Sequence, residues 1–267
     1  MKKTLILTAF MALSSITGYA STVVVTFSAN NVNPSGTTTP VAGLYFAGKT
    51  GTVNQVKTGD GGGSYTSSSL TAFDGTSTGI TLVTGAGACG NNGYLRGNNI
   101  KDSHDSNNTN KFFDVFGMDM AVGQNYGGCI NKESGGFTMQ LQGLSSGSYT
   151  LTMLVGRNNV HGTASSTYSL SGVTGVSVNV LDYSTGISSS IADNAVTLDV
   201  GQDSNLPGEW ALVEYTFTST TDNTTLSLNI NGTGNIGALA LASVPEPATA
   251  SLGLLGLGVL LMRRRRA

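Results

Sequence analysis

The chain contains few charged residues, and this scarcity narrows the classes of protein it can belong to. Asp, Glu, Lys and Arg together make up 10% of its 267 residues. Long segments rich in Glu, Lys, Ala and Leu, which would form helices, are absent, whereas Gly, Ser, Thr and Asn dominate. This composition is typical of short β-strands joined by many turns. Disorder is disfavoured because apolar residues alternate in register and the net charge is small.

Cysteine and histidine are also scarce, which limits the chemistry available to the chain. Neither of the two histidines, His104 and His161, lies in a motif that marks a catalytic base. The two cysteines, Cys89 and Cys129, are too few and too far apart to suggest a metal site. In an exported protein they favour a disulfide, which would close a loop of about 40 residues.

The N-terminus has the three parts of a secretory signal peptide. Residues 1–3 are basic, residues 4–13 are mostly apolar, and residues 18–20 form a small-x-small cleavage site. We therefore expect export through the Sec translocon and cleavage after Ala20. An N-terminal membrane anchor is disfavoured because the apolar run is short and a cleavage site follows it.

The C-terminus begins with an extended motif and ends in a basic cluster. Pro245 and Pro247 flank Glu246 and disfavour helix, so this stretch should be accessible to a processing enzyme. Residues 248–262 carry no charge and as a helix would span roughly 22 Å, less than the roughly 30 Å of a bilayer core. The arginines that follow would hold the end of a short transmembrane helix on the cytoplasmic side. The motif and the cluster comprise Val244, Pro245, Glu246, Pro247, Arg263, Arg264, Arg265 and Arg266. A disordered basic tail is the alternative.

This tail, residues 244–267, resembles the PEP-CTERM sorting signal of bacterial exosortase substrates. The resemblance implies a transient anchor in the inner membrane and processing by an exosortase near residues 245–247. Delivery to the cell surface or an extracellular matrix would follow. Similar tails also carry the label of an ice-binding protein C-terminal domain, which describes the tail and says nothing about ice in the rest of the chain.

Residues 21–243 form the exported body between signal peptide (1–20) and sorting tail (244–267). The body has seven basic and 14 acidic residues, so its net charge is about −7. This charge disfavours binding to nucleic acid or anionic lipid. Strand-like segments recur along it with turn signals between them, which predicts one all-β domain, a β-sandwich or jelly roll. Loops are expected at 30–40, 59–63 and 85–111, and order resumes at 112–120.

The clearest strands lie in the second half of the body. Alternation around the turn at residues 145–148 predicts a hairpin that runs from Phe137 to Val155. Further strands are expected at 166–170, 176–181, 195–200, 210–218 and 226–230, and a last one at 236–241. From Phe137 onward this order resembles carbohydrate-binding-module and galactose-binding-like jelly rolls, through residues 147–151, 210–217 and 222–228. That resemblance implies a fold and transfers no ligand residue.

Two glycine motifs are rejected as functional sites. Residues 85–90 fit G-x-G-x-x-G, but the Asn91-Asn92-Gly93 that follows does not start a dinucleotide-binding helix. Residues 143–147 fit G-x-S-x-G, but they lead into a strand, whereas a nucleophile elbow leads into a helix.

Two weaker candidates for ligand contact remain. Asp102 and Asp105 lie in a polar loop whose oxygens suit Ca²⁺, although a plain solvated loop explains them equally. Glu209 and Trp210 could contact a sugar, although a lone tryptophan in a sandwich is usually core. We expect no other cofactor.

Four functions are consistent with these patterns. The first is a non-catalytic surface or matrix module that binds a polysaccharide or another polymer. The second is an extracellular glycan hydrolase, which would need two carboxylates 5 to 10 Å apart, roughly the spacing that glycosidases use. The third is an ice- or surface-binding protein with a flat threonine face, and the fourth is a pure scaffold. The sequence shows no fixed repeat that would support the third.

Overall fold

The computed structural model describes residues 21–28, 37–46, 49–57, 64–85, 89–91, 129–131, 135–157, 164–183, 187–200, 209–232 and 234–244. Every regular element in these ranges is a strand. The described residues contain no helix that is long and apolar enough to cross a membrane. The predicted signal peptide, the predicted membrane helix and the segments 59–63 and 112–120 lie outside the described residues. The signal peptide and the membrane helix therefore stay predictions.

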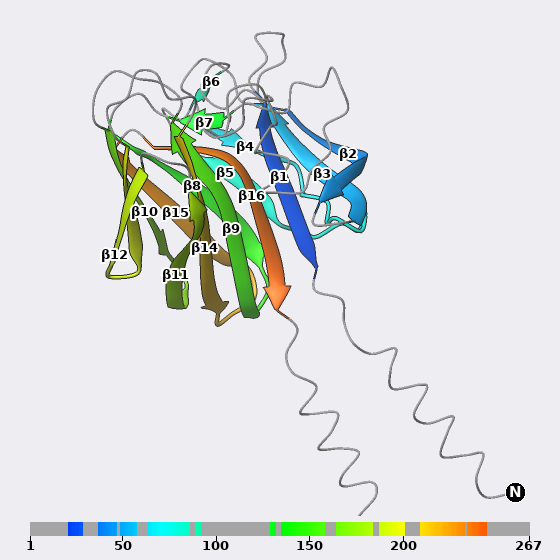
Figure 1. Cartoon of the computed structure of the whole chain (residues 1–267). Coiled ribbons are helices and arrows are strands. Elements are labelled where there is room, and N and C mark those ends of the chain that lie inside the picture. Colours follow the sequence, from blue (N-terminus) through cyan, green and yellow to red (C-terminus); the bar gives the residue numbers. More distant parts are fainter. Residues whose placement is uncertain are drawn as a thin grey trace, which may run out of the picture.

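The strands form two sheets that stack as a sandwich (Figure 1). The larger, sheet A, has nine strands in the order β11–β14–β9–β16–β1–β3–β2, and β7 joins β6 to β16. Its pairs are antiparallel except β1 with β3. Its strands are β1 (Thr22–Ser28), β2 (Thr37–Phe46), β3 (Lys49–Lys57), β6 (Cys89–Asn91), β7 (Cys129–Asn131), β9 (Gly147–Arg157), β11 (Thr174–Tyr183), β14 (Glu209–Ser219) and β16 (Asn235–Val244).

Sheet B has seven strands, all antiparallel, in the order β12–β13–β10–β15–β8–β5–β4. They are β4 (Tyr65–Thr66), β5 (Thr81–Thr84), β8 (Phe137–Leu144), β10 (Ala164–Ser171), β12 (Ile187–Ala192), β13 (Ala195–Val200) and β15 (Thr224–Gly232). The expected all-β, two-sheet sandwich is confirmed.

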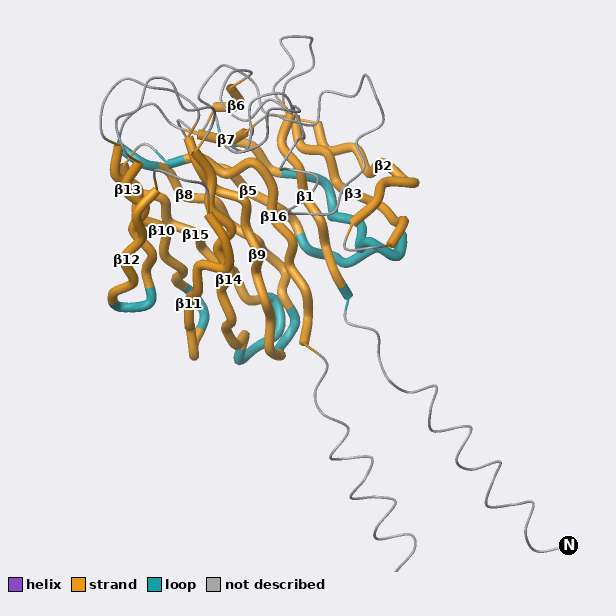
Figure 2. Tube along the Cα trace, in the orientation of Figure 1, coloured by secondary structure: helices purple, strands orange, loops and turns teal. Residues whose placement is uncertain are grey.

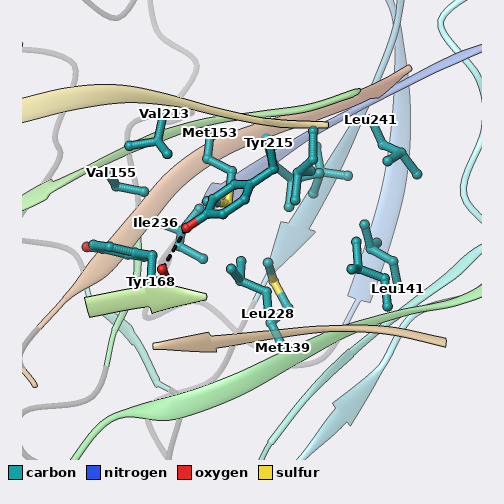
Figure 3. Close-up of a cluster of buried hydrophobic side chains, with 14 of the residues drawn as sticks. Met139, Leu141, Met153, Val155, Tyr168, Val213, Tyr215, Leu228, Ile236 and Leu241 are labelled. Carbon is teal, nitrogen blue, oxygen red and sulfur yellow. Dashed lines mark hydrogen bonds between the residues drawn. The ribbon is translucent and has the colours of Figure 1, made fainter. Parts of the chain in front are cut away.

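The core lies between the sheets and follows the period-two alternation of the sequence. The residues predicted to face inward on β8, β14 and β15 are all buried: Phe137, Met139, Leu141, Val213, Tyr215, Phe217, Leu226, Leu228 and Ile230. Tyr215 also links the sheets, because its hydroxyl on β14 donates a 2.6 Å hydrogen bond to the carbonyl oxygen of Tyr168 on β10 (Figure 3). Burial raises the pKa of Tyr215, so the phenol stays protonated and keeps this donor.

The first and last strands of the described body lie side by side in sheet A. β1 and β16 are antiparallel, with Thr22 opposite Ala242. Next to this pair the Ser243 N–H donates to the carbonyl oxygen of Ser21 at 3.0 Å, and the Ser21 N–H donates to Ser243 Oγ at 2.9 Å. The start of β1 and the end of β16 therefore meet at one end of the sandwich (Figures 1 and 2).

The predicted hairpin between residues 137 and 155 is wrong in its pairing. β8 and β9 are both present, but β8 pairs with β5 and β15 in sheet B, whereas β9 pairs with β14 and β16 in sheet A. The alternation of apolar and polar residues shows which face of a strand is buried, but it does not show which other strand pairs with it. The turn carries the chain from one sheet to the other, and Gly143 at φ +85° lies against the carbonyl oxygen of Gly79.

Three other boundaries differ from expectation. β2 begins at Thr37, inside the predicted loop 30–40, and β6 lies inside the predicted loop 85–111. β12 was not predicted, because the sequence of Ile187–Ala192 has three serines and its side chains are exposed after the first residue. Pairing with β13 along its whole length holds this strand in place.

Candidate functional site

The outer side of sheet B carries a continuous set of amide and hydroxyl side chains. These side chains alternate with the buried residues of β8, β15, β10 and β13, so they point away from the core. We call this set the polar face. It comprises Thr138, Gln140, Gln142, Ser227, Asn229, Asn231, Ser165, Thr167, Ser169, Ser171, Thr197 and Asp199.

Strand register aligns these side chains into rows that cross the sheet. One row runs from Thr138 to Asn229 and on to Ser169, each residue opposite the next. A second row runs from Gln140 to Ser227 and on to Ser171. Neighbouring strands of a sheet lie about 4.8 Å apart, so the rows present polar groups at a regular spacing.

Hydrogen bonds within the face hold many of these side chains in place. Thr138 Oγ1 donates to Asn229 Oδ1 at 3.2 Å, and Asn229 Nδ2 donates to Ser171 Oγ at 3.0 Å. Gln140 Nε2 donates to Ser227 Oγ at 3.3 Å, and the amide of Gln142 donates to Gln140 Oε1 at 3.0 Å.

The hydroxyls of Thr167 and Thr197 are 2.9 Å apart on β10 and β13, which extends the network to a third pair of strands. Each of these groups keeps further donor or acceptor capacity, because a hydroxyl or amide can form more than one hydrogen bond.

The polar face is nearly free of charge and open to solvent. Asp199 is its one charged member, and the others are half-buried or exposed. The outer side of sheet A differs, since Val24, Leu154 and Ala238 point outward there and are fully buried. Of the two outer faces, the one on sheet B therefore offers the larger accessible array of neutral hydrogen-bonding groups.

The predicted ligand residues do not join this face. Glu209 and Trp210 are the first two residues of β14 in sheet A, opposite Arg157 and Gly156 of β9, and their side chains lie outside the described part. Asp102, Asp105, His104 and His161 also lie outside it. Among the residues that the structure describes, no three His, Cys, Asp or Glu side chains gather as a metal site would require.

The two cysteines fall on paired strands but not opposite each other. Cys89 on β6 faces Asn131, and Cys129 on β7 faces Asn91. Such diagonal positions are about 7–8 Å apart at Cα, whereas a disulfide normally spans about 4.4–6.8 Å. In this register the predicted disulfide is not supported. It would require β6 and β7 to shift.

Most of the sorting tail lies outside the described residues. Val244 is the last residue of β16 and is exposed, so the predicted processing segment 245–247 follows the sandwich directly. Ala20 is also outside, and Ser21 beside it is the first described residue.

Sequence reasoning missed the polar face, although part of its signal was visible. Thr138, Gln140 and Gln142 alternate with apolar residues in the sequence. Their partners on β15 and β10 could not be assigned, because the order of strands in the sheet is not encoded in alternation.

Comparison with known proteins identifies the sorting motif of the tail. Residues 243–266 match the PEP-CTERM protein-sorting motif. This motif implies that the chain is exported and sorted to the cell surface by an exosortase. No curated protein matches the chain.

Two solved structures bear a weak likeness to the body. CBM35 from Cellvibrio japonicus Abf62 aligns at 15% identity and a TM-score of 0.27, over 61% of this chain and 91% of that one. BcpA*(D312A), the major pilin subunit of Bacillus cereus, aligns at 11% identity and a TM-score of 0.12, over 75% of this chain and 59% of that one. Neither superposition is close enough to carry an argument about a ligand.

Proposed function

We propose that the body is a non-catalytic module that binds a neutral, hydroxyl-rich polysaccharide through the polar face. The sorting motif delivers it to the surface or matrix, where such polymers are found. The observation that carries the proposal is the row structure of the polar face, with its ordered amide and hydroxyl groups and its single carboxylate.

The chemistry of the face favours an uncharged partner. Binding a neutral polymer here exchanges hydrogen bonds to water for hydrogen bonds to sugar hydroxyls, each worth about 0.5–1.5 kcal/mol net. Desolvating a charged side chain is costly, and the polar face has only one charged side chain to desolvate. Side chains already fixed by bonds such as Asn229 to Ser171 lose little further freedom when they bind.

Two acidic residues of the described part are unsuited to act as the general acid of a hydrolase. A general acid needs a raised pKa, but hydrogen bonds from Thr76 and Ser146 lower the pKa of Asp74 and Asp222, respectively. Both groups are then ionised at neutral pH and serve to fix turns.

The test is co-sedimentation of the processed, exported protein with insoluble neutral and carboxylated polysaccharides. We expect binding to a neutral glucan or mannan and weaker binding to the carboxylated polymer. The double variant Gln140→Ala/Asn229→Ala should lose most of the bound fraction. The matched control is Ser177→Ala/Thr216→Ala, which removes a 2.7 Å hydroxyl pair from β11 and β14 of sheet A. Equal loss in both variants, or no binding by the wild type, would refute the proposal.

Calcium is varied in the same assay. If the loop with Asp102 and Asp105 forms a Ca²⁺ site that supports binding, chelation with EDTA should weaken binding, and Asp102→Asn/Asp105→Asn should abolish that sensitivity.

A further inference from the structure

The two sheets end side by side at one lateral edge of the sandwich. β11 is the last strand of sheet A and β12 is the last strand of sheet B, and three residues link them (Figure 1). Among the described strands, β11 pairs with β14 alone and β12 with β13 alone. The outer backbone groups of both strands are therefore available to another strand.

Exposed apolar side chains lie on both strands of this edge, two near the linked end of β11 and one toward the far end of β12. Leu181 and Tyr183 on β11 are 46% and 54% exposed, and Ile191 on β12 is 51% exposed. They are three of the four large apolar side chains that are exposed in the described part of the chain. Val176, Val178 and Val180 on β11 pack against the core and are only half-buried. The core is therefore incompletely covered between β11 and β12.

The edge has few of the features that normally prevent strand pairing. Asp182 is the only charged residue of β11, and β12 has no charge; neither strand contains proline. β11 has a register shift on each side of residues 177–180, and its pairing with β14 resumes at residues 182–183. β12 pairs with β13 without irregularity over six residues, which indicates a straight edge.

The directions of the two strands suit a two-fold symmetric partner. The chain runs along β11 and returns along β12, so the strands are antiparallel across the sandwich. A two-fold axis parallel to the strands, between the sheets, brings β12 of a second copy beside β11 and antiparallel to it. The same axis brings β11 of that copy beside β12. The contact is closed and self-complementary, as isologous interfaces are.

We propose that this edge docks a second copy of the chain, with β11 of each copy paired to β12 of the other. Both sheets continue from one copy into the next, and Leu181, Tyr183 and Ile191 become covered. This proposal does not depend on polysaccharide binding.

The symmetry also suits attachment at a surface. An axis parallel to the strands keeps both copies the same way up. The end of β16, from which the sorting tail leaves, then lies at the same end of the sandwich in both copies. Both sorting tails of the dimer could therefore reach the same membrane.

The experiment is sedimentation equilibrium on the processed protein as its host exports it. We expect the wild type to have the mass of a dimer. Ile191→Lys and Tyr183→Lys should each weaken the dimer tenfold or more, with the folded state checked by circular dichroism; two variants are made in case one fails to fold. Thr39→Lys, at an exposed residue of β2 on the opposite edge, is the matched control and should leave the dimer intact. A monomeric wild type would overturn the proposal. So would a dimer that survives both edge variants, or one that Thr39→Lys dissociates.

Discussion

At the scale of single residues, the buried amide of Asn54 adds polar contacts between two parts of the chain that the core also joins. Asn54 on β3 is fully buried, and its Nδ2 donates to the carbonyl oxygens of Val24 at 3.0 Å and Thr71 at 2.7 Å. Its Oδ1 accepts a 2.8 Å hydrogen bond from the Thr71 N–H. One side chain thus ties the segment 64–80 to sheet A.

Replacing Asn54 with Leu should destabilise the protein by about 3 kcal/mol. Leu has the same branching and number of side-chain heavy atoms as Asn, but backbone groups of Val24 and Thr71 lose their partner, at about 1–3 kcal/mol for each buried group left unsatisfied. Chemical denaturation measures the change. Gln55→Leu, at the neighbouring outward-facing position, is the control and should change stability by less than about 1 kcal/mol. Similar effects at both positions would contradict this role for Asn54.

The carboxyl group of Asp222 makes the stability of the folded protein depend on pH in the acidic range. Its Oδ1 accepts the Ser146 N–H at 2.8 Å, and this bond lowers the pKa of the carboxyl in the folded state. A lowered folded-state pKa adds stability above the unfolded-state pKa, and this contribution disappears as the pH falls through the folded-state pKa. The wild type should therefore be more stable than Asp222→Asn at pH 6, and the difference should shrink and then vanish as acid protonates the carboxyl in the folded state. Denaturation midpoints from pH 6 downward measure it, and a pH-independent difference would contradict it.

At the scale of elements, the alternation of apolar and polar residues predicts the buried face of a strand but not the strand with which it pairs. The inward faces of β8, β14 and β15 were predictable because each carries apolar residues at every second position. The pairing of β8 with β15 was not, because 79 residues separate Leu144, the end of β8, from Thr224, the start of β15, and the intervening strands belong to both sheets. The polar face depends on that pairing, so it could not be predicted either.

The crossover from β8 to β9 should be sensitive to a side chain at Gly143. This residue has φ +85°, and an added Cβ would lie 2.7 Å from the carbonyl oxygen of Gly79. Gly143→Ala should cost about 3 kcal/mol, from backbone strain and from the clash. Gly135→Ala isolates the strain, because Gly135 has φ +81° with nothing near its Cβ, and should cost about 1 kcal/mol. Equal costs by thermal unfolding would show that Gly143 is not in contact with Gly79.

The short strands β6 and β7 provide a test of the predicted disulfide. In the register of the structure Cys89 and Cys129 are diagonal, so we expect both thiols of the exported protein to be alkylated without reduction. Mass spectrometry of the alkylated protein measures this. Protection of both thiols until reduction would show that the bond forms and that β6 and β7 pair in another register.

At the scale of the whole molecule, the sorting motif and the polar face that we propose binds a polymer lie in different places. The sorting motif begins where β16 ends, beside the start of β1, whereas the polar face covers the outer side of sheet B. A variant of the tail should therefore change delivery without changing the proposed binding to a polymer.

Replacing Glu246 with Ala, or deleting residues 263–266, should leave unprocessed protein in the membrane fraction. The first change alters the sorting motif, and the second removes the charges that we expect to hold the tail on the cytoplasmic side. Immunoblots of membrane and surface fractions measure the outcome. Surface delivery equal to that of the wild type would contradict the role assigned to the tail.

A matched pair of charge insertions tests whether the polar face binds a neutral polymer, as we propose. Ser227→Asp places a carboxylate in the middle of the face, whereas Thr216→Asp places one on the outer side of sheet A. Both proteins are compared with the wild type for affinity to the same neutral glucan, after equal thermal stability is established. We predict that Ser227→Asp weakens binding about tenfold or more, because the new charge must be desolvated, and that Thr216→Asp leaves it unchanged. Unchanged binding by Ser227→Asp, or an equal loss in both variants, would contradict the claim.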